Sequence, residues 1–446
     1  MKGPATPDFR SGEEDPTPHP APHPAPQEVA ARLKALARGE GFDPVGITLP
    51  SPSRHSGFLR GWVEEGRHGT MDYLARPDAL ERRGDPRRSL PVARSALVVA
   101  HEYFQEDPEG VPGDPSRGVI ARYARGRDYH RVVKKGLDRV HRGLEEELGR
   151  SVAGRSYVDT GPLLERELGE RAGLGWFGRN TMLIHPRRGS YFFLGVLLLE
   201  LEAEVDEPLG RDHCGSCRAC LDACPTGALL GRDADGAPVM DATLCISYLT
   251  IENRGPIPRE LRPLMGNRVY GCDICQEVCP FNVKFAEEAV ESGYAARGPG
   301  ERPVGVEASG PAGPGSESAA PLHPGTDAPS LVDLLSMALS EEGWESFSRG
   351  SAIRRAGRAG FARNVCVALG NWLSGKEEPP SEAVRVLAAA LSDPESLVRG
   401  HAAWALGRIS SAAARSALER RASVEEDPWV RSEIISALEE STPTRK

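Results

Sequence analysis

The stretch HCGSCRACLDACP, residues 213–225, decides the fold of the middle of this 446-residue chain. Its four cysteines follow the spacing C-x2-C-x2-C-x3-C, and a proline comes directly after the last one. Runs of this kind bind [4Fe-4S] clusters in proteins that carry two of them, and the fourth cysteine serves the neighbouring cluster. The stretch therefore predicts a pair of iron-sulfur clusters, and it requires a second group of cysteines elsewhere in the chain.

The second group begins at RVYGCDICQEVCP, residues 268–280, which is one cysteine short. It ends in C-x2-C-x3-C-P, but Val269 stands where the first cysteine of a full run would be. A valine cannot bind iron, and Cys245 is the only other cysteine nearby, on a connection long enough to fold back. The interlocked spacing then gives two ligand sets, which are Cys214, Cys217, Cys220 and Cys279 for one cluster and Cys224, Cys245, Cys272 and Cys275 for the other.

Zinc sites and disulfides are the alternatives for these cysteines. Zinc ribbons space their C-x2-C pairs differently and need no interlocked third and fourth cysteine before a proline. Disulfides are less favoured because no signal peptide is evident and the spacing fits metal. The ninth cysteine, Cys366, lies in an apolar helical pattern and is expected to be an inert core thiol.

Length and composition limit the remaining possibilities. A chain of this length predicts two to four domains, at about 100–200 residues each. The longest apolar run, YFFLGVLLLE at residues 191–200, is too short to span a membrane and predicts a buried strand. We therefore expect a protein that works in the cytoplasm without a membrane. The net charge of −9 argues against nucleic-acid binding through bulk charge, although a local basic face could still bind it.

Changes of pattern along the chain predict five segments. Residues 1–26 are proline-rich and predict a disordered tail. In residues 27–205, helical patterns alternate with short apolar strands, which predicts an α/β or α+β domain. Residues 206–290 form the two-cluster domain. A Gly/Pro/Ser-rich linker is predicted over residues 291–328, and helical repeats over residues 329–446.

The last segment repeats itself. Arg363, Arg399 and Arg431 each precede an apolar stripe that ends in Ala-Leu, at intervals of 36 and 32 residues. This period is typical of helix-pair solenoids of the HEAT type, which usually present a binding surface. The alternative is that these helices only cap the domain before them.

A glycine-rich stretch and two missing motifs bear on other cofactors. GLGWFG, residues 173–178, matches the dinucleotide-binding pattern G-x-G-x-x-G, but a helical pattern precedes it where a strand is required, so we reject that interpretation. The sequence contains no phosphate-binding G-x-x-x-x-G-K-[ST] motif and therefore no sign of ATP use. It also lacks D-x-H-x-x-G, the pattern by which some enzymes supply a histidine to cobalamin.

Several blocks together closely resemble epoxyqueuosine reductases. They include RYARGRDYHRVVKKGL (122–137), YVDTGPLLERELGERAGLGWFGRN (157–180), GSYFFLGVLLL (189–199) and CISYLTIE (245–252). The resemblance covers about residues 28–290 and extends into the repeats. It implies a cobalamin-binding domain with a nitroreductase-like core, then a two-cluster ferredoxin-like domain, and then an α-helical HEAT-like domain that binds tRNA.

The resemblance also implies an activity. Members of this family reduce epoxyqueuosine to queuosine at the wobble position of tRNAs with GUN anticodons, and the epoxide oxygen leaves as water. The implied cofactors are cobalamin, which acts as cob(I)alamin, and two [4Fe-4S] clusters. The clusters pass electrons singly from an external low-potential donor such as flavodoxin or ferredoxin. We expect a monomeric enzyme.

Site residues are carried over by position. Asp159 in YVDTG is the implied acid, with a pKa raised by burial beside the corrin; alternatively it only caps the helix that follows. Asp128, Tyr129 and His130 either form part of the pocket or begin a helix. The implied cobalamin contacts are Arg83, Asp159, Leu183, Leu194, Ser247, Cys272 and Asp273.

Two groups of arginines are candidate phosphate contacts. One is a compact basic run in the repeats, and the other lies near the clusters; together they are Arg349, Arg354, Arg355, Arg358 and Arg363, and Arg254, Arg259, Arg262 and Arg268. Two rival functions remain open. A reductive dehalogenase would normally carry an export signal and no repeats, and an electron-transfer adaptor would need no corrinoid.

Overall fold

A four-stranded antiparallel sheet forms the centre of the first half of the chain. The computed structural model describes residues 24–107, 113–294 and 329–440. The strand order is β1-β2-β7-β4, with bounds Val45–Thr48, Ser95–Glu102, Phe192–Leu199 and Gly154–Tyr157. All but one of the residues of β7 are buried, because β7 is an inner strand with helices on both faces. The strand predicted from the apolar run at 191–200 is confirmed.

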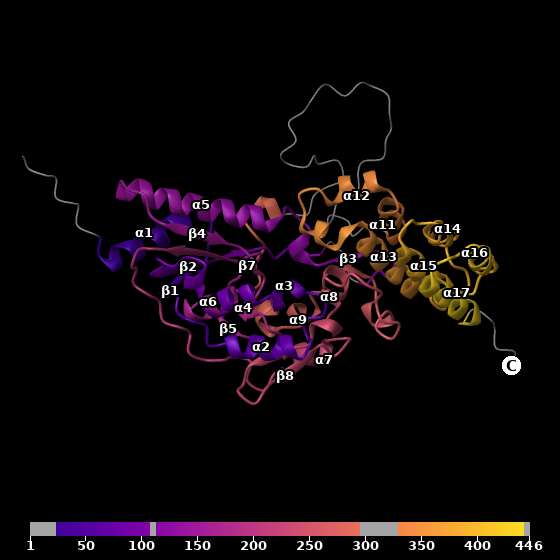
Figure 1. Ribbon diagram of the computed structural model, residues 1–446, viewed down its shortest axis with the longest axis horizontal. Coiled ribbons are helices and arrows are strands. Elements are labelled where there is room, and N and C mark those ends of the chain that lie inside the picture. Colours follow the sequence, from indigo (N-terminus) through magenta and orange to yellow (C-terminus); the bar gives the residue numbers. More distant parts are fainter. Residues whose placement is uncertain (1–23, 108–112, 295–328, 441–446) are drawn as a thin grey trace, which may run out of the picture.

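Helices cover both faces of this sheet, and Figure 1 shows them above and below it. On one face lie α1 (Pro26–Gly39) and α5 (Tyr129–Leu148), and on the other lies α6 (Glu165–Arg171). The buried residues of α5 recur at three- and four-residue spacing, so one stripe of the helix faces the sheet. An antiparallel sheet with helices packed on it is an α+β arrangement, as the sequence indicated.

Shorter elements follow in the middle of the chain. The chain before the cysteine-rich region also contains α2 (Ser56–Glu64), α3 (Asp72–Ala75), α4 (Pro77–Gly84), β3 (Val119–Ile120), β5 (Trp176–Phe177) and β6 (Leu183–Ile184). The cysteine-rich region contributes α7 (Ala219–Ala223), β8 (Leu229–Arg232), β9 (Pro238–Met240), α8 (Ile246–Ile251), β10 (Arg268–Tyr270), α9 (Ile274–Glu277) and α10 (Pro280–Phe285). The glycine-rich GLGWFG stretch contains β5 of the hairpin β5–β6 and does not open a helix, so the strand-turn-helix unit of a dinucleotide site is not formed there.

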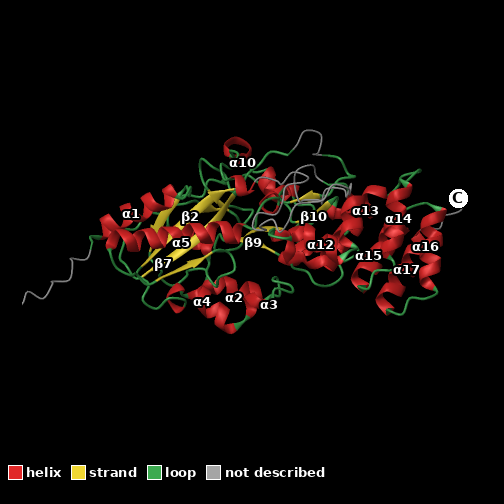
Figure 2. Cartoon of the chain, turned by 90° about the horizontal axis from the view of Figure 1, so that it is seen from above, coloured by secondary structure: helices red, strands yellow, loops and turns green. Residues whose placement is uncertain are grey.

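The C-terminal part is a stack of helices, at the right of Figures 1 and 2. Its members are α11 (Leu331–Ala338), α12 (Glu341–Ser348), α13 (Gly357–Leu373), α14 (Ser381–Ala390), α15 (Ser396–Gly407), α16 (Ala412–Ala422) and α17 (Pro428–Glu440). The three segments that share the Arg and Ala-Leu pattern are α13, α15 and α17, which pack side by side in one layer. The predicted repeats are thus confirmed. Among the described residues, no helix is long and apolar enough to cross a membrane.

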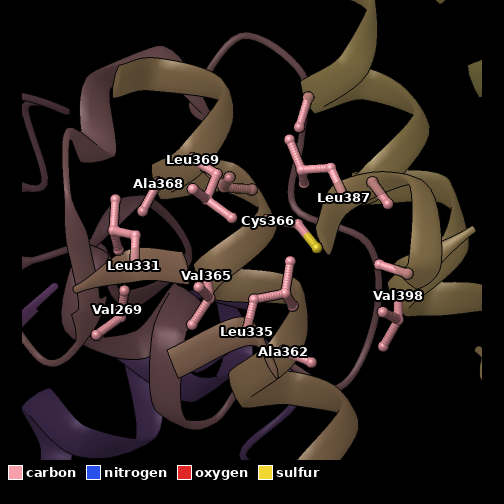
Figure 3. Packing of buried hydrophobic residues seen from close by; sticks show 14 of the residues in the cluster. Val269, Leu331, Leu335, Ala362, Val365, Cys366, Ala368, Leu369, Leu387 and Val398 are labelled. Atoms are coloured by element: carbon pink, nitrogen blue, oxygen red, sulfur yellow. The ribbon is translucent and has the colours of Figure 1, made fainter. Parts of the chain in front are cut away.

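One hydrophobic core joins the helical stack to the cysteine-rich region. Cys366 is fully buried in it among residues of α11, α13 and α14, as Figure 3 shows, so its interpretation as a core thiol is confirmed. Val269 is also fully buried in this core, on β10, which pairs with β3 in parallel. The position that lacks a cysteine is therefore filled by an apolar side chain of the hydrophobic core.

Most of two predicted segments fall outside the described residues. Residues 1–23 of the predicted tail (1–26) and residues 295–328 of the predicted linker (291–328) are not described. The first helix begins at Pro26, one residue before the predicted domain.

Candidate functional site

A cavity of about 650 Å³ lies between the sheet, the α2–α4 segment and the cysteine-rich region. All seven side chains predicted from the resemblance to contact cobalamin line it, from six separate parts of the chain: Arg83, Asp159, Leu183, Leu194, Ser247, Cys272 and Asp273. Residues separated by up to 190 positions (273 − 83) therefore meet at one site. Their role as contacts stays a prediction, but the fold places them around one volume.

Most of the wall is apolar, with a few polar groups. Phe58, Leu59 and Trp62 of α2 face the cavity, and so does Phe177 from the rejected glycine-rich stretch. Arg83 is only 8% exposed, and its Nη1 atom is buried without a hydrogen-bond partner in the described chain. Buried donors are normally satisfied, so a ligand with an acceptor at this point would complete the site. The wall thus fits a large, mainly apolar group with polar substituents.

Asp159 projects into this cavity from a loop. It is 65% exposed, and it adopts a left-handed backbone conformation with φ of 55°, which is unusual for a non-glycine residue. Its backbone N–H donates to Glu165 Oε1 at 2.7 Å. Helix α6 begins only at Glu165, with Leu164 as the residue before it. The alternative interpretation of Asp159 as the cap of this helix is therefore wrong.

His130 connects Asp159 to a second carboxylate. Its Nε2 lies 3.2 Å from Asp159 Oδ2, and its Nδ1 lies 2.6 Å from Asp128 Oδ1. Burial alone would lower the pKa of His130, but its hydrogen bonds and attraction to these two carboxylates outweigh burial and raise it to about 9. Asp128 also caps α5 by accepting from the His130 N–H. The helix-start interpretation of Asp128 is therefore confirmed, whereas Tyr129 is the one of the three residues that lines the cavity.

The expected rise in the pKa of Asp159 is not found in the protein alone. Desolvation by the cavity wall around Asp159 raises this pKa, but the hydrogen bond and charge of His130, together with the Tyr129 hydroxyl, outweigh that desolvation, and the net pKa lies below its ordinary value. The raised carboxyl is instead Glu165, whose pKa burial and then the charge of Asp159 increase to about 8. Sequence reasoning missed Glu165, although it lies in the same quoted block, six residues after Asp159.

Four of the eight cysteines predicted to bind the clusters meet at the cavity wall. Cys224, Cys245, Cys272 and Cys275 all line the cavity. Burial, and then the nearby Cys245 and Cys272, raise the pKa of Cys275 well above its ordinary value. In the other group, burial and then Cys214 and Cys279 raise the pKa of Cys220 to about 11. These raised pKa values belong to the thiols without iron, and bound iron would keep the cysteines deprotonated as thiolates.

The two groups are adjacent and differ in exposure. Cys220 is close enough to Cys275 to influence its pKa. Cys217 is exposed, whereas Cys275 borders the cavity. In the described parts of the chain, no three His, Cys, Asp or Glu side chains surround a position for a single metal ion. Each cysteine of a [4Fe-4S] cluster binds a different iron, so the four sulfur atoms lie farther apart than the ligands of a single metal ion.

Three of the arginines predicted to contact phosphate are structural instead. Arg363 is 1% exposed, Arg262 is buried against Glu433 at 2.7 Å, and Arg358 is buried against Asp393 at 2.8 Å. These guanidinium groups are buried and bonded to partners inside the protein, so they cannot contact phosphate, and these three predictions are wrong. Tertiary packing removed them from the surface, which a count of basic residues in the sequence could not reveal.

Other arginines of the two groups remain at the surface. Arg354 is exposed and pairs with Glu345, and Arg355 is exposed and makes a two-pronged ion pair with Glu252. Such exposed pairs contribute little to stability, about 0–1 kcal/mol each. These side chains could therefore exchange their partners for phosphate at little cost.

Replacing Arg363 by alanine is expected to lower the free energy of unfolding by about 3 kcal/mol or more. Its guanidinium donates to the carbonyls of Leu249, Asn253 and Gly255 at 2.6–2.8 Å, and these acceptors would be left unpaired. Urea denaturation measures the change. Arg354→Ala, at an exposed site, is the matched control and should change stability by less than about 0.5 kcal/mol. Equal effects of the two variants would contradict the structural role of Arg363.

Comparison with family models gives three matches along the chain. Residues 83–160 match the family described as epoxyqueuosine reductase QueG. Residues 213–282 match a 4Fe-4S double cluster binding domain, and residues 350–439 match HEAT repeats. The first match includes Arg83 and Asp159, and the second contains all eight predicted cluster ligands.

Curated relatives and solved structures agree with these matches. The epoxyqueuosine reductase of Pseudomonas aeruginosa is 38% identical over 382 residues, covering 85% of this chain and 94% of the relative. That of Escherichia coli is 36% identical over 383 residues, covering 85% and 89%. A crystal structure of epoxyqueuosine reductase with an epoxyqueuosine-modified tRNA-Tyr stem loop has a TM-score of 0.75 and 30% identity, covering 92% of this chain and 98% of that one.

Proposed function

This chain belongs to the epoxyqueuosine reductase family, and on that premise we propose that its cavity holds a corrinoid beside the cluster bound by Cys224, Cys245, Cys272 and Cys275. The enzyme reduces epoxyqueuosine in tRNA to queuosine. Residues 27–205 would form the corrinoid-binding domain of nitroreductase-like type, and residues 206–290 the two-cluster domain. Residues 329–446 would contribute to tRNA binding.

The residues on the cavity wall suit this cofactor. Leu183 and Leu194 offer apolar contact to a flat ring, and the unsatisfied Nη1 of Arg83 offers a donor to one of its polar substituents. When bound, a corrinoid supplies a reduced metal centre that can collect two electrons which arrive one at a time. The four cysteines that line the cavity would hold the cluster that delivers these electrons.

Asp159 is the proposed acid. Its carboxylate lies in the cavity, where the epoxide oxygen would be released, and His130 donates to Oδ2. Because the pKa of His130 is about 9, the imidazole holds a proton at neutral pH and can pass it to Asp159. The proton thus stays in the site even though Asp159 alone favours its ionised form.

Partners follow from the substrate and from the exposed cluster ligand. Exposed arginines such as Arg354 and Arg355 would contact tRNA phosphates, because cations fix the register of nucleic acids through the backbone. A low-potential donor such as flavodoxin or ferredoxin would dock near the exposed Cys217. We propose that the enzyme is a monomer and that it acts in the cytoplasm.

The observation that carries this proposal is the joint placement of the seven predicted contacts and four cluster ligands around one cavity. An anaerobic assay tests it, with cluster-reconstituted protein, cobalamin, a chemical reductant and epoxyqueuosine-containing tRNA. We expect conversion to queuosine, a loss of one oxygen mass, only when cobalamin is present. Absence of conversion with both clusters intact and cobalamin bound would favour a dehalogenase-like reductase. Failure to bind cobalamin would favour the electron-transfer adaptor.

A further inference from the structure

The stoichiometry of the reaction asks for two protons. The inference that follows rests on the proposed function. When an epoxide loses its oxygen as water, both C–O bonds break, a C=C bond forms, two electrons enter from the external donor, and the oxygen takes up two protons. Asp159, supplied by His130, accounts for one of them. Once the corrinoid and the modified nucleotide fill the cavity, they would displace bulk water from it, so the second proton needs a source among the protein's own groups.

We propose that Glu165 is a second catalytic acid, which donates the other proton from Oε2 to the departing oxygen. Glu165 lines the same cavity as Asp159. Its Oε1 is fixed by the backbone N–H of Asp159 at 2.7 Å. Within the described residues, Oε2 makes no hydrogen bond, so it is available to a ligand. One carboxyl group thus has one oxygen that orients it and one that can react.

The surroundings of Glu165 keep it protonated at neutral pH. Burial is the main cause of its pKa of about 8, and the charge of Asp159 adds to it. His130 and Arg166 oppose this rise, but they do not reverse it. The charge of an ionised Glu165 would also raise the pKa of Arg83 on α4. A carboxyl with such a pKa carries a proton at pH 7 and releases it readily, as a general acid must.

Glu165 and the His130–Asp159 pair would therefore each supply one of the two protons. The two groups lose their protons at different pH values, Glu165 near pH 8 and His130 near pH 9. Both contribute below pH 8, and activity should decline as pH rises through these two values. The alternative is that Glu165 only accepts the Asp159 N–H and positions the loop.

The variant Glu165→Gln separates these roles, because its amide oxygen can still accept the Asp159 N–H but the side chain has no acidic proton. With the reconstituted enzyme and epoxyqueuosine-containing tRNA, single-turnover rates are measured at pH values on both sides of 8. We expect the E165Q rate to fall by about 10²-fold. We also expect its pH profile to lose the decline near 8 and keep the one near 9. An E165Q variant with the wild-type rate and profile would overturn the proposal.

Glu170→Gln is the matched control, on the same helix. Glu170 pairs with Arg54 and is not among the residues that line the cavity. E170Q should keep the wild-type rate and both declines. If E170Q and E165Q lose activity equally, a general effect on α6 explains the loss, and the acid role is overturned.

Infrared spectroscopy of the cluster-containing protein without substrate gives a readout that does not depend on activity. A protonated carboxyl absorbs at a C=O frequency that a carboxylate lacks. Wild type and E170Q should show a band that disappears with a midpoint near pH 8, and E165Q should lack it. Absence of the band in the wild type at pH 7 would overturn the proposal. A wild-type enzyme that fails to convert the tRNA would instead overturn the proposed function itself.

Discussion

Replacing Asp159 by asparagine is expected to lower the rate of epoxyqueuosine reduction by about 10²–10⁴-fold, the usual contribution of a general acid. Asparagine has nearly the same shape and can still accept a hydrogen bond from His130, but it cannot transfer a proton to the epoxide oxygen. The loop should therefore keep its position while the reaction loses its first proton. The rate is measured in a single turnover, with the nucleosides read by mass spectrometry.

Binding measurements separate a lost acid from a lost site. The D159N variant should still bind cobalamin, followed by its visible absorption, and should keep the iron content of the wild type. Asp138→Asn on α5 is the control, because Asp138 is exposed and pairs with Lys134 outside the cavity. It should react at the wild-type rate. Wild-type turnover by D159N would show that the first proton comes from elsewhere.

Replacing Cys245 by alanine is expected to abolish the reaction and to remove one of the two clusters. Cys245 stands directly before α8, at the cavity, and burial raises the pKa of its thiol. Without it, the set of Cys224, Cys272 and Cys275 has three thiolates for a cluster that takes four. Iron should fall from about eight to about four per chain, because each cluster carries four irons.

The matched control for this change is Cys366→Ala. Cys366 is a fully buried cysteine in the hydrophobic core of α13 and is not one of the eight predicted cluster ligands. This variant should keep about eight irons and the wild-type rate, at a modest loss of stability. Electron paramagnetic resonance of the reduced proteins would show whether C245A has lost the coupling between two neighbouring clusters. If C245A keeps all its iron and its activity, the fourth ligand of the short cysteine run is not Cys245.

Local sequence patterns predicted much of this protein because their geometry is local. The C-x2-C spacing fits a cluster whatever surrounds it, and the repeated Arg and Ala-Leu pattern marks the stacked helices α13, α15 and α17. The apolar run at 191–200 became the inner strand β7 for the same reason, since a segment that apolar must be covered on both faces. The resemblance added the seven contacts, which the fold collects around one cavity.

The sequence alone therefore determined which residues can bind iron and which segments repeat, whereas only the tertiary structure decided the state of each charged group. The sequence predicts Arg363 to be a surface cation. In the fold, α13 packs against residues about 110 positions earlier, and their carbonyls accept hydrogen bonds from the Arg363 guanidinium. Asp159 has a lowered pKa because His130 from a distant helix pairs with it, whereas burial and then the charge of Asp159 raise the pKa of Glu165. Burial and charge pairing depend on distances through space, and no local pattern encodes them.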